Sequence, residues 1–487
     1  MKASLIAMPI IFGIILLGAI TGIYAGFRRQ MNLDQWTVAG RGFGLVLIWL
    51  LMAGEVYTTF AFLGASGWAY SRGGPTLYIL AYLTLAYVIS FFILPRIWEL
   101  GRKFSLHTQP DFFLQRYANR PLASLVAAVG VIFIIPYLQL QLTGLGIIVQ
   151  VASFDAISRP VSISIAFVIV AGFVLSSGIR AVAWVSVLKD SLMLLAAFII
   201  GIGVPYHYFG GIRPMFHALV LAKATHLTMP GSTANMGHTW YVSTVLLTAL
   251  GGYMWPHAFG SIYSAKSGDT LRRNAVIMPL YNLTLPLLFF VGFTAILVLP
   301  GLKNGDMALL LTVRKTFSPW LLGLVGGAGA LTAMVPAAML LLTAGTLFAK
   351  NFFRPLFAPA MTDDAVAKLA KAMVVVVTGL AMYLALYSST TLVGLLLFAY
   401  SGIAQFFPGV ILGLYWKRAN SAGVLAGIIA GVSTGMVLTF TKHDPVGGLN
   451  AGFVALCVNL AITAAVSRMT AAQPNRFEEE AKSAVAT

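Results

Sequence analysis

The sequence predicts an all-α membrane protein with thirteen transmembrane helices. Of the 487 residues, 59% are hydrophobic and only 9% are charged, whereas a soluble chain has about half apolar and about a quarter charged residues. In addition, apolar runs of about 20 residues, the length that crosses a bilayer as a helix, recur along the whole chain. Most side chains must therefore contact lipid or other helices, and the lipid bilayer is a predicted partner.

The predicted spans share a largely apolar composition and are separated by short polar connections. Residues 76–95 in the third span contain no charged side chain, and the sixth span is the least clear because Lys189 and Asp190 lie near its start. In chain order the predicted spans are 4–26, 45–70, 75–97, 121–151, 160–179, 183–207, 238–262, 275–299, 318–349, 367–388, 390–415, 421–440 and 448–467.

The formal net charge of +17 would suggest a nucleic-acid partner in a soluble protein, but here the basic residues lie in short loops between apolar runs. With the N-terminus outside, 22 of the 31 Lys and Arg residues fall on the cytoplasmic side and 9 outside. This asymmetry follows the positive-inside rule. It predicts a multi-pass protein of the bacterial inner membrane with a cytoplasmic C-terminal tail, 468–487, and no nucleic-acid partner.

The residue types that enzymes use in metal and nucleophile sites are sparse. The single cysteine, Cys457, lies in an apolar run, so neither a disulfide within the chain nor a multi-cysteine metal site is possible. The His-Glu-x-x-His and phosphate-loop patterns are absent from the sequence, and its one Gly-x-Ser-x-Gly match, at residues 431–435, lies inside a predicted span. We therefore predict that the chain is not an enzyme and has neither a metal site nor a cofactor.

The second span contains an acid in the middle of an apolar run. Glu55 follows Gly54 and precedes Thr58 and Thr59. A charge at that depth costs a few kcal/mol unless it is paired or protonated, so an intramembrane acid is a functional candidate by default. The sequence leaves two interpretations open: a role in proton coupling or substrate gating, and a structural carboxyl that is protonated or paired with an arginine.

The seventh span contains a second interruption, because Gly251 and Gly252 loosen a turn and Pro256 removes a backbone donor. Trp255 and His257 flank this proline. A histidine can bind or release a proton near neutral pH. The alternative is a simple kink with a hydrogen-bonded histidine.

The ninth span is predicted to break as well, at Pro336. Transporters bind substrate where spanning helices are broken near the midplane. Gly54, Gly251, Gly252, Pro256 and Pro336 are therefore candidate hinge residues.

Several motifs resemble those of the sodium:solute symporter family, over most of the chain. Its monocarboxylate permease (MctP-like) branch is the most similar, through Gly54–Phe60, Gly64–Tyr70 and Val335–Ala338. The family motifs are Thr108-Gln-Pro-Asp-Phe-Phe-Leu-Gln-Arg-Tyr117, Ser177-Gly-Ile-Arg-Ala-Val-Ala-Trp184, Pro256-His257, Ser264-Ala-Lys-Ser267 and Arg272-Arg-Asn-Ala275.

The resemblance implies a LeuT-like core of two inverted five-helix repeats (5+5). On this sequence the first repeat would cover 45–207 and the second 238–415, with the first span and the last two spans outside the core. The broken second and seventh spans would hold the substrate. The two interruptions found from the residues fall in those same spans.

One departure from the family concerns the coupling ion. Sodium-coupled members carry a Ser/Thr pair early in the ninth span, where this chain has Val335 and Pro336. An Asp and a Gln common in the sixth span are replaced by Ser186 and Lys189. We therefore hypothesise that the usual sodium site is lost and that coupling is by proton, through Glu55, Lys189 or His257, or is absent. The choice between H⁺ and Na⁺ as the coupling ion stays open. The alternative for Lys189 is that its side chain reaches the cytoplasmic interface.

The resemblance predicts a secondary active transporter (symporter) that imports a small organic solute by alternating access, with a monocarboxylate such as lactate or pyruvate favoured. Backbone amides at the broken helix ends would hold the carboxylate. The candidate side-chain contacts are Glu55, Thr58, Thr59, Trp255 and His257. Three alternatives remain: a symporter for an amino acid or another carboxylate, a sensor or receptor that uses a symporter-like domain, and a membrane-embedded enzyme. The oligomeric state stays open.

Overall fold

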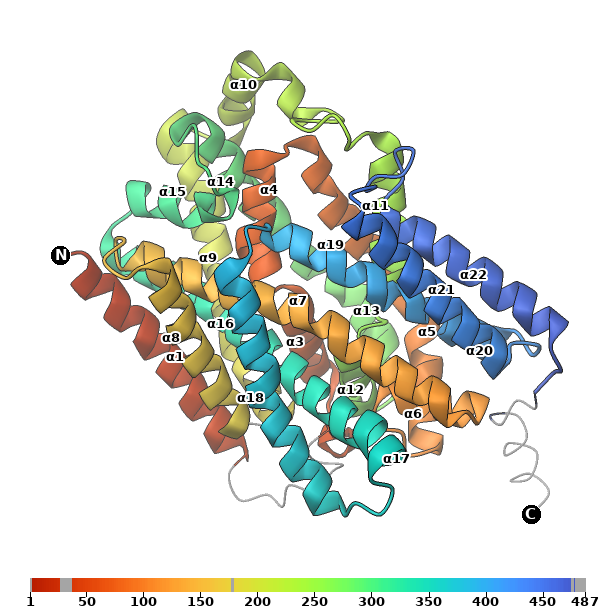
Figure 1. Cartoon of the computed structure of the whole chain (residues 1–487). Helices are drawn as coiled ribbons and strands as arrows, with labels where there is room; N and C mark the ends of the chain where they lie inside the picture. Colours follow the sequence, from red (N-terminus) through yellow and green to blue (C-terminus); the bar gives the residue numbers. More distant parts are fainter. Residues whose placement is uncertain (1, 27–36, 177–178, 474–476, 478–487) are drawn as a thin grey trace.

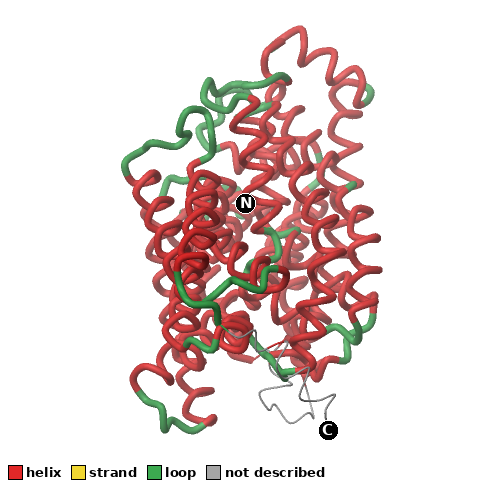
Figure 2. Tube along the Cα trace, turned by 90° about the vertical axis from the view of Figure 1, so that its right-hand side faces the viewer, coloured by secondary structure: helices red, strands yellow, loops and turns green. Residues whose placement is uncertain are grey.

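The computed structural model describes residues 2–26, 37–176, 179–473 and 477. These residues form helices, and strand-like pairing within them is limited to isolated bridges from Phe43 to Ala265 and from Val446 to Leu449. Figure 2 shows helices lying side by side with loops mostly at the two ends of the bundle. The all-α prediction is confirmed.

Many of the described helices follow one another after short breaks, and two segments, η2 (Phe60–Gly64) and η6 (Leu347–Phe353), are π-helical. The α-helices carry the labels of Figure 1: α1 (Ser4–Gly26), α3 (Leu45–Val56), α4 (Ala65–Ser71), α5 (Tyr78–Lys103), α6 (Gln109–Tyr117), α7 (Arg120–Ala152), α8 (Arg159–Ser176), α9 (Ile179–Phe209), α10 (Ile212–Ala222), α11 (His238–Gly251), α12 (Pro256–Ser264), α13 (Gly268–Asn282), α14 (Thr284–Val298), α15 (Ala308–Thr316), α16 (Pro319–Thr346), α17 (Arg354–Phe357), α18 (Asp363–Tyr387), α19 (Leu392–Ile403), α20 (Phe407–Tyr415), α21 (Ser421–Phe440) and α22 (Ala451–Met469).

The count of thirteen spans is not confirmed. Among the described residues, ten helical segments are long and apolar enough to cross a membrane, and the pair Leu45–Val56 and Phe60–Ser71, bent by 57°, adds an eleventh. Two predicted spans do not meet this standard. Residues 160–179 correspond to α8, whose apolar part is too short, and residues 238–262 divide into α11 and α12. An apolar run in the sequence does not reveal whether its helix is continuous.

The predicted break at Pro336 is wrong, because α16 runs without interruption from Pro319 to Thr346. A proline inside a helix removes one hydrogen bond and costs about 3 kcal/mol. The packing around α16 compensates for this loss, because 94% of its most apolar stretch is buried. The helix contacts α1, α7, α9 and α18, among others. The helix becomes irregular only at η6, eleven residues later in the chain.

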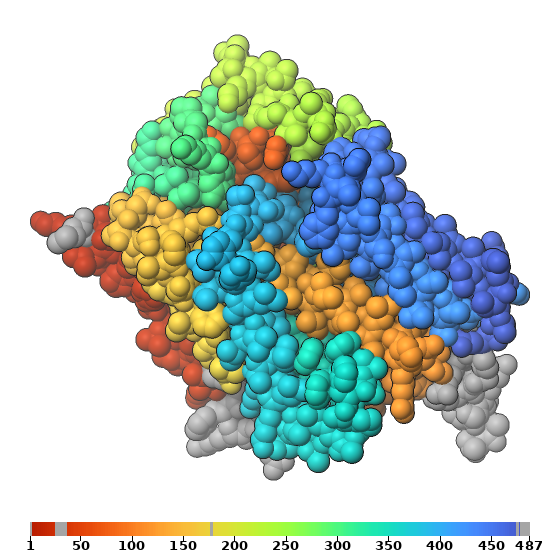
Figure 3. Space-filling model, in the orientation of Figure 1, coloured from red at the N-terminus to blue at the C-terminus, as the bar shows by residue number. Residues whose placement is uncertain are grey.

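The interior and the edge of the bundle differ in burial. In the most apolar stretch of each span, 72% of the residues of α7 and 94% of those of α16 are buried. The corresponding shares are 28% for α1 and 33% for both α21 and α22. Burial alone does not separate the predicted core from the other spans, because α18, in the predicted second repeat, is also 28% buried. In Figure 3 the orange atoms of α7 lie between the blue C-terminal helices and cyan α18.

Two predictions extend beyond the described residues. Residues 177 and 178 of the Ser177–Trp184 motif lie outside them, as does the predicted tail from residue 474 on, apart from Phe477.

Candidate functional site

The first interruption lies where the sequence predicted it, between α3 and η2. Helix α3 ends at Val56, and Tyr57 has the non-helical angles φ −90° and ψ 77°. The candidate hinge Gly54 is within α3, two residues before its end. A Cβ added to Gly54 would lie 2.8 Å from the Ser186 hydroxyl and 3.6 Å from a methyl of Val335. Gly54 therefore lets α3 approach α9 and α16 closely, and the bend itself is at residues 57–58.

The second interruption separates α11 from α12 at residues 252–255. Pro256 occupies the first turn of α12, where its missing N–H costs nothing and its fixed φ favours helix initiation. A Cβ on Gly251 would lie 3.0 Å from the Ala404 side chain, so this glycine serves a close contact with the segment after α19. The predicted break in the seventh span is confirmed.

The two interruptions border one enclosed cavity of about 30 Å³. A volume of 10–15 Å³ holds about one water molecule, so the structure represents a nearly closed state. Aromatic rings dominate the wall, and neither lysine nor arginine contributes to it. The lining residues are Met52, Glu55, Val56, Tyr82, Tyr137, Gly252, Tyr253, Trp255, His257, Ala258, Leu396 and Tyr400.

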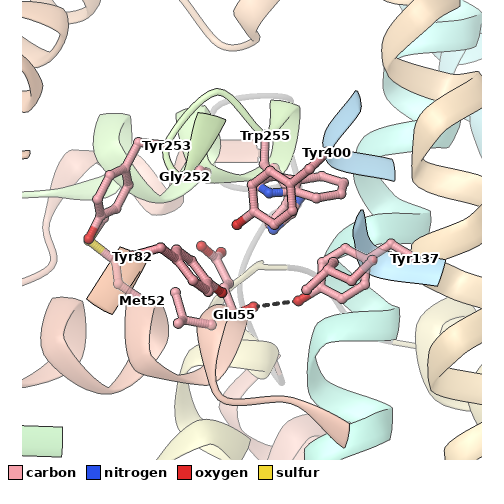
Figure 4. A pocket seen from close by; sticks show the side chains of 12 residues that line it. Met52, Glu55, Tyr82, Tyr137, Gly252, Tyr253, Trp255 and Tyr400 are labelled. Carbon is pink, nitrogen blue, oxygen red and sulfur yellow. Dashed lines mark hydrogen bonds between the residues drawn. The ribbon is translucent and has the colours of Figure 1, made fainter. Parts of the chain in front are cut away.

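Glu55 lines this cavity with a side chain that is only 5% exposed. Its carboxylate accepts a hydrogen bond from the Ser261 hydroxyl of α12, so it joins the two broken spans. The hydroxyl of Tyr137 donates to the backbone carbonyl of Glu55 at 2.9 Å, as Figure 4 shows. This bond satisfies a carbonyl in the last turn of α3, which has no helical partner of its own.

Tyr137 is a site residue that the sequence analysis missed. It lies on α7, and its ring centroid is 4.8 Å from Trp255 and 6.2 Å from His257. The side chain therefore touches both interruptions at once. One pattern in the sequence could have indicated it. Gln139 and Gln141 follow Tyr137 at alternate positions, so three polar side chains lie close together in an apolar helix.

Trp255 and His257 lie where the sequence predicted them, in the wall of the cavity beside Glu55. His257 is 3% exposed, and its Nδ1 has no hydrogen-bond partner among the described residues. Trp255 packs edge-on against Tyr400 of α19 with 5.3 Å between centroids. Glu55, Trp255 and His257 therefore line one cavity, and the side-chain partner of the Glu55 carboxylate is the Ser261 hydroxyl.

Thr58 and Thr59 do not line the cavity in this structure. The Thr58 hydroxyl accepts from the backbone N–H of Phe60 at the start of η2. The Thr59 hydroxyl donates to Oε1 of Gln141 at 2.6 Å. Both side chains are fully buried, so they stabilise the irregular segment after the break and are not brought together with Glu55 and His257.

Lys189 and Asp190 form an ion pair with 2.7 Å between Nζ and Oδ1, and both side chains are completely buried. The alternative that Lys189 reaches the membrane surface is therefore wrong. The sequence places Asp190 near the start of its predicted span, but α9 begins at Ile179 rather than at residue 183. Asp190 therefore lies deeper in the helix and is a second buried acid. Tyr281 donates to Asp190 at 2.8 Å.

An enclosed cavity between two interrupted spanning helices defines the class of protein: a multi-pass membrane protein built like a secondary transporter. Its particular family follows from the sequence profile of the sodium:solute symporter family, which matches residues 36–431. The chain belongs to this family and is a secondary active symporter.

Relatives over nearly the whole chain agree with this assignment. The uncharacterized symporter YhjB of Bacillus subtilis is 45% identical over 477 residues, which is 95% of this chain and 97% of the relative. A monocarboxylate transport permease of Rhizobium johnstonii is 28% identical and covers 91% of both chains.

Solved structures show the same fold. A Na⁺-coupled sialic acid symporter in a substrate-bound, outward-open state matches with a TM-score of 0.78 at 16% identity, over 96% of this chain and 99% of the other. The nucleobase-cation symporter Mhp1 in a closed conformation matches with a TM-score of 0.55 at 14% identity, over 89% of this chain and 95% of the other. These neighbours are symporters of the LeuT-like fold.

Proposed function

We propose that this symporter imports a small monocarboxylate, such as lactate or pyruvate, together with a proton. The observation that carries the proposal is the cavity between the two interruptions, which Glu55 and His257 both line. The 28% identity to a monocarboxylate transport permease supports the substrate class.

A carboxylate can be held in this cavity without a basic side chain in its wall. The N-terminus of α12 borders the cavity at His257 and Ala258, and helix N-termini favour anions through their free N–H groups and the helix dipole. A protonated Glu55 donates a hydrogen bond to the substrate, whereas an ionised Glu55 repels it. Substrate and proton therefore enter the cavity as a pair.

The surroundings of Gly54 support a proton rather than sodium as the coupling ion. Sodium prefers hard oxygen ligands, but the positions that the family resemblance assigns to the hydroxyl pair are Val335 and Pro336. The nearby Ser186 hydroxyl donates to the Val182 carbonyl of its own helix. Lys189 supplies a fixed positive charge on the same helix, one turn further along.

We further propose thirteen crossings, with α8 as a short span and α11–α12 as a broken one. The N-terminus is then outside, and α6 and α17 lie on the cytoplasmic side of the inner membrane, where the Lys and Arg excess falls. The two repeats cover residues 45–207 and 238–415.

Uptake of labelled lactate and pyruvate into proteoliposomes tests this proposal, with a proton gradient and a sodium gradient imposed separately. Accumulation driven by the proton gradient without sodium is the expected result. Accumulation that requires sodium overturns the assignment of the ion. No uptake of either solute under both gradients overturns the assignment of the substrate.

A further inference from the structure

Helix α6 is a short amphipathic helix outside the predicted spans that packs against α12, one of the helices bordering the cavity. Its first turn is fixed by a capping box, in which the Thr108 hydroxyl accepts from the Asp111 N–H and the Asp111 carboxylate accepts from the Thr108 N–H. On its other side the ring of Phe112 lies 6.2 Å from that of Phe259 on α12. Helix α6 therefore packs directly against the second broken span.

Gln109, the first residue of α6, reaches into the interruption between α11 and α12. Its side chain is fully buried, and its Nε2 donates to the backbone carbonyl of Met254 at 2.7 Å. Met254 is itself 2% exposed and is flanked by the cavity-lining residues Tyr253 and Trp255. A buried carbonyl in an unwound segment has no helical partner and costs free energy when it is unsatisfied. The Nε2 of Gln109 gives this carbonyl its partner.

The start of α6 is in turn anchored to the end of α16. Asp111 accepts hydrogen bonds from Lys350 Nζ at 2.7 Å and from Asn351 Nδ2 at 2.9 Å, both on the π-helix η6. Burial opposes ionisation of Asp111, but the Lys350 ammonium and the Asn351 amide outweigh it and hold the pKa of Asp111 below its ordinary value. The anchor is therefore charged at neutral pH and fixes the position from which Gln109 reaches Met254.

From this geometry we propose that Gln109 is a latch. It is a positioning residue that holds residues 252–255 in the closed arrangement, and its bond to Met254 breaks when the cavity opens toward α6. An opening on this side separates α12 from α6, and Gln109 lies between the two. The proposal rests on alternating access by a symporter and does not depend on which solute or ion is carried.

The single cysteine makes a test possible that needs no substrate. In a Cys457→Ser background, an Ala258→Cys reporter places a thiol in the cavity wall, and a membrane-impermeant maleimide added on the α6 side measures how often the cavity opens there. Gln109→Met keeps the length of the side chain but removes the donor. We expect about a tenfold faster labelling rate, which corresponds to ~1.4 kcal/mol.

The matched control is Gln139→Met. Gln139 is also buried and donates to a backbone carbonyl, that of Leu384, but in the continuous helix α18. The labelling rate of Gln139→Met is expected to stay within twofold of that of the Cys457→Ser/Ala258→Cys parent. An unchanged labelling rate in Gln109→Met, or an equal increase in both variants, overturns the proposal that Gln109 holds the closed arrangement.

A second variant keeps the test decisive if Gln109→Met does not fold. Asp111→Asn weakens the anchor to Lys350 and is expected to raise the labelling rate in the same direction by a smaller factor. If Gln109→Met folds, the double variant is expected to label no faster than Gln109→Met alone, because both changes act through one contact. A slower or unchanged rate in Asp111→Asn contradicts the anchoring of Gln109 by α6. Failure of lactate uptake would leave these measurements intact.

Discussion

Two buried acids on neighbouring helices have opposite surroundings. Asp190 on α9 lies 2.7 Å from the Lys189 ammonium and accepts a hydrogen bond from Tyr281. Glu55 on α3 lines the cavity, and the partner of its carboxylate there is the Ser261 hydroxyl. The first acid is compensated inside the protein, and the second faces the space that a solute would occupy.

The difference separates a structural charge from a functional one. A buried ion pair is costly to break because removal of one partner leaves an uncompensated charge. An acid beside a cavity can exchange its proton with the cavity contents without disrupting an ion pair. We therefore propose that Glu55 exchanges the proton and that Lys189 and Asp190 have a fixed electrostatic role.

Glu55→Gln is expected to have the largest effect. The amide can still bond to Ser261 but cannot release a proton, so proton-driven accumulation in proteoliposomes falls at least about 100-fold, as expected for a lost proton-transfer group. Solute exchange across the membrane without a gradient should persist. The control is Glu99→Gln, which changes an exposed acid on α5. Retained accumulation in Glu55→Gln would refute the assignment of Glu55.

Lys189→Met tests how much the buried ion pair between Lys189 and Asp190 contributes to stability. Removal of the ammonium leaves Asp190 buried and unpaired, which costs about 3–5 kcal/mol of folding free energy. We expect a clear fall in Tm of the detergent-solubilised protein. The double variant Lys189→Met/Asp190→Asn should recover most of the loss, because no uncompensated charge remains. A double variant that is as unstable as Lys189→Met would show that the ammonium is needed for more than neutralising Asp190.

Tyr137→Phe probes the link between the two interruptions. The change removes the hydroxyl that bonds to the Glu55 carbonyl but keeps the ring against Trp255. A buried acceptor left without its donor costs about 1–3 kcal/mol, so the KM for transport should rise roughly tenfold while expression stays normal. Tyr383→Phe, on the exposed surface of α18, is the matched control. Equal KM values for the two variants would remove Tyr137 from the site.

For Asp306, in the connection between α14 and α15, we expect a smaller effect, which is a dependence of stability on pH. Burial raises its pKa to about 7, although the backbone N–H of Leu392 bonds to the carboxylate. The folded state then binds more protons than the unfolded state between about pH 4 and pH 7, so stability falls as the pH rises through this window.

Asp306→Asn is expected to remove this dependence. The Tm of the variant at pH 8 should exceed that of the parent, while the two should agree more closely at pH 4, where the parent carboxyl is protonated. Asp155→Asn serves as the control at an exposed acid. A parent Tm that is flat between pH 4 and pH 7 would contradict the raised pKa of Asp306.

The amino-acid sequence determined the class and the main irregularities of this protein. Apolar runs of spanning length require helices in a bilayer, because lipid cannot satisfy backbone hydrogen bonds. Glu55 in one such run, and Gly252 with Pro256 in another, marked the two interruptions. These signals are local, and nearby residues produce them.

Only the tertiary structure decided which of these local signals count. The sequence around Pro336 predicted a break, yet packing against neighbouring helices keeps α16 continuous. Lys189 could have reached the surface, yet α9 places it beside Asp190 with no exposed area. Tyr137 and Gln109 bond to carbonyls at residues 55 and 254, which are distant in the chain. Contacts of this kind depend on how helices pack against one another, and helical propensity and hydrophobic patterns contain no information about that arrangement.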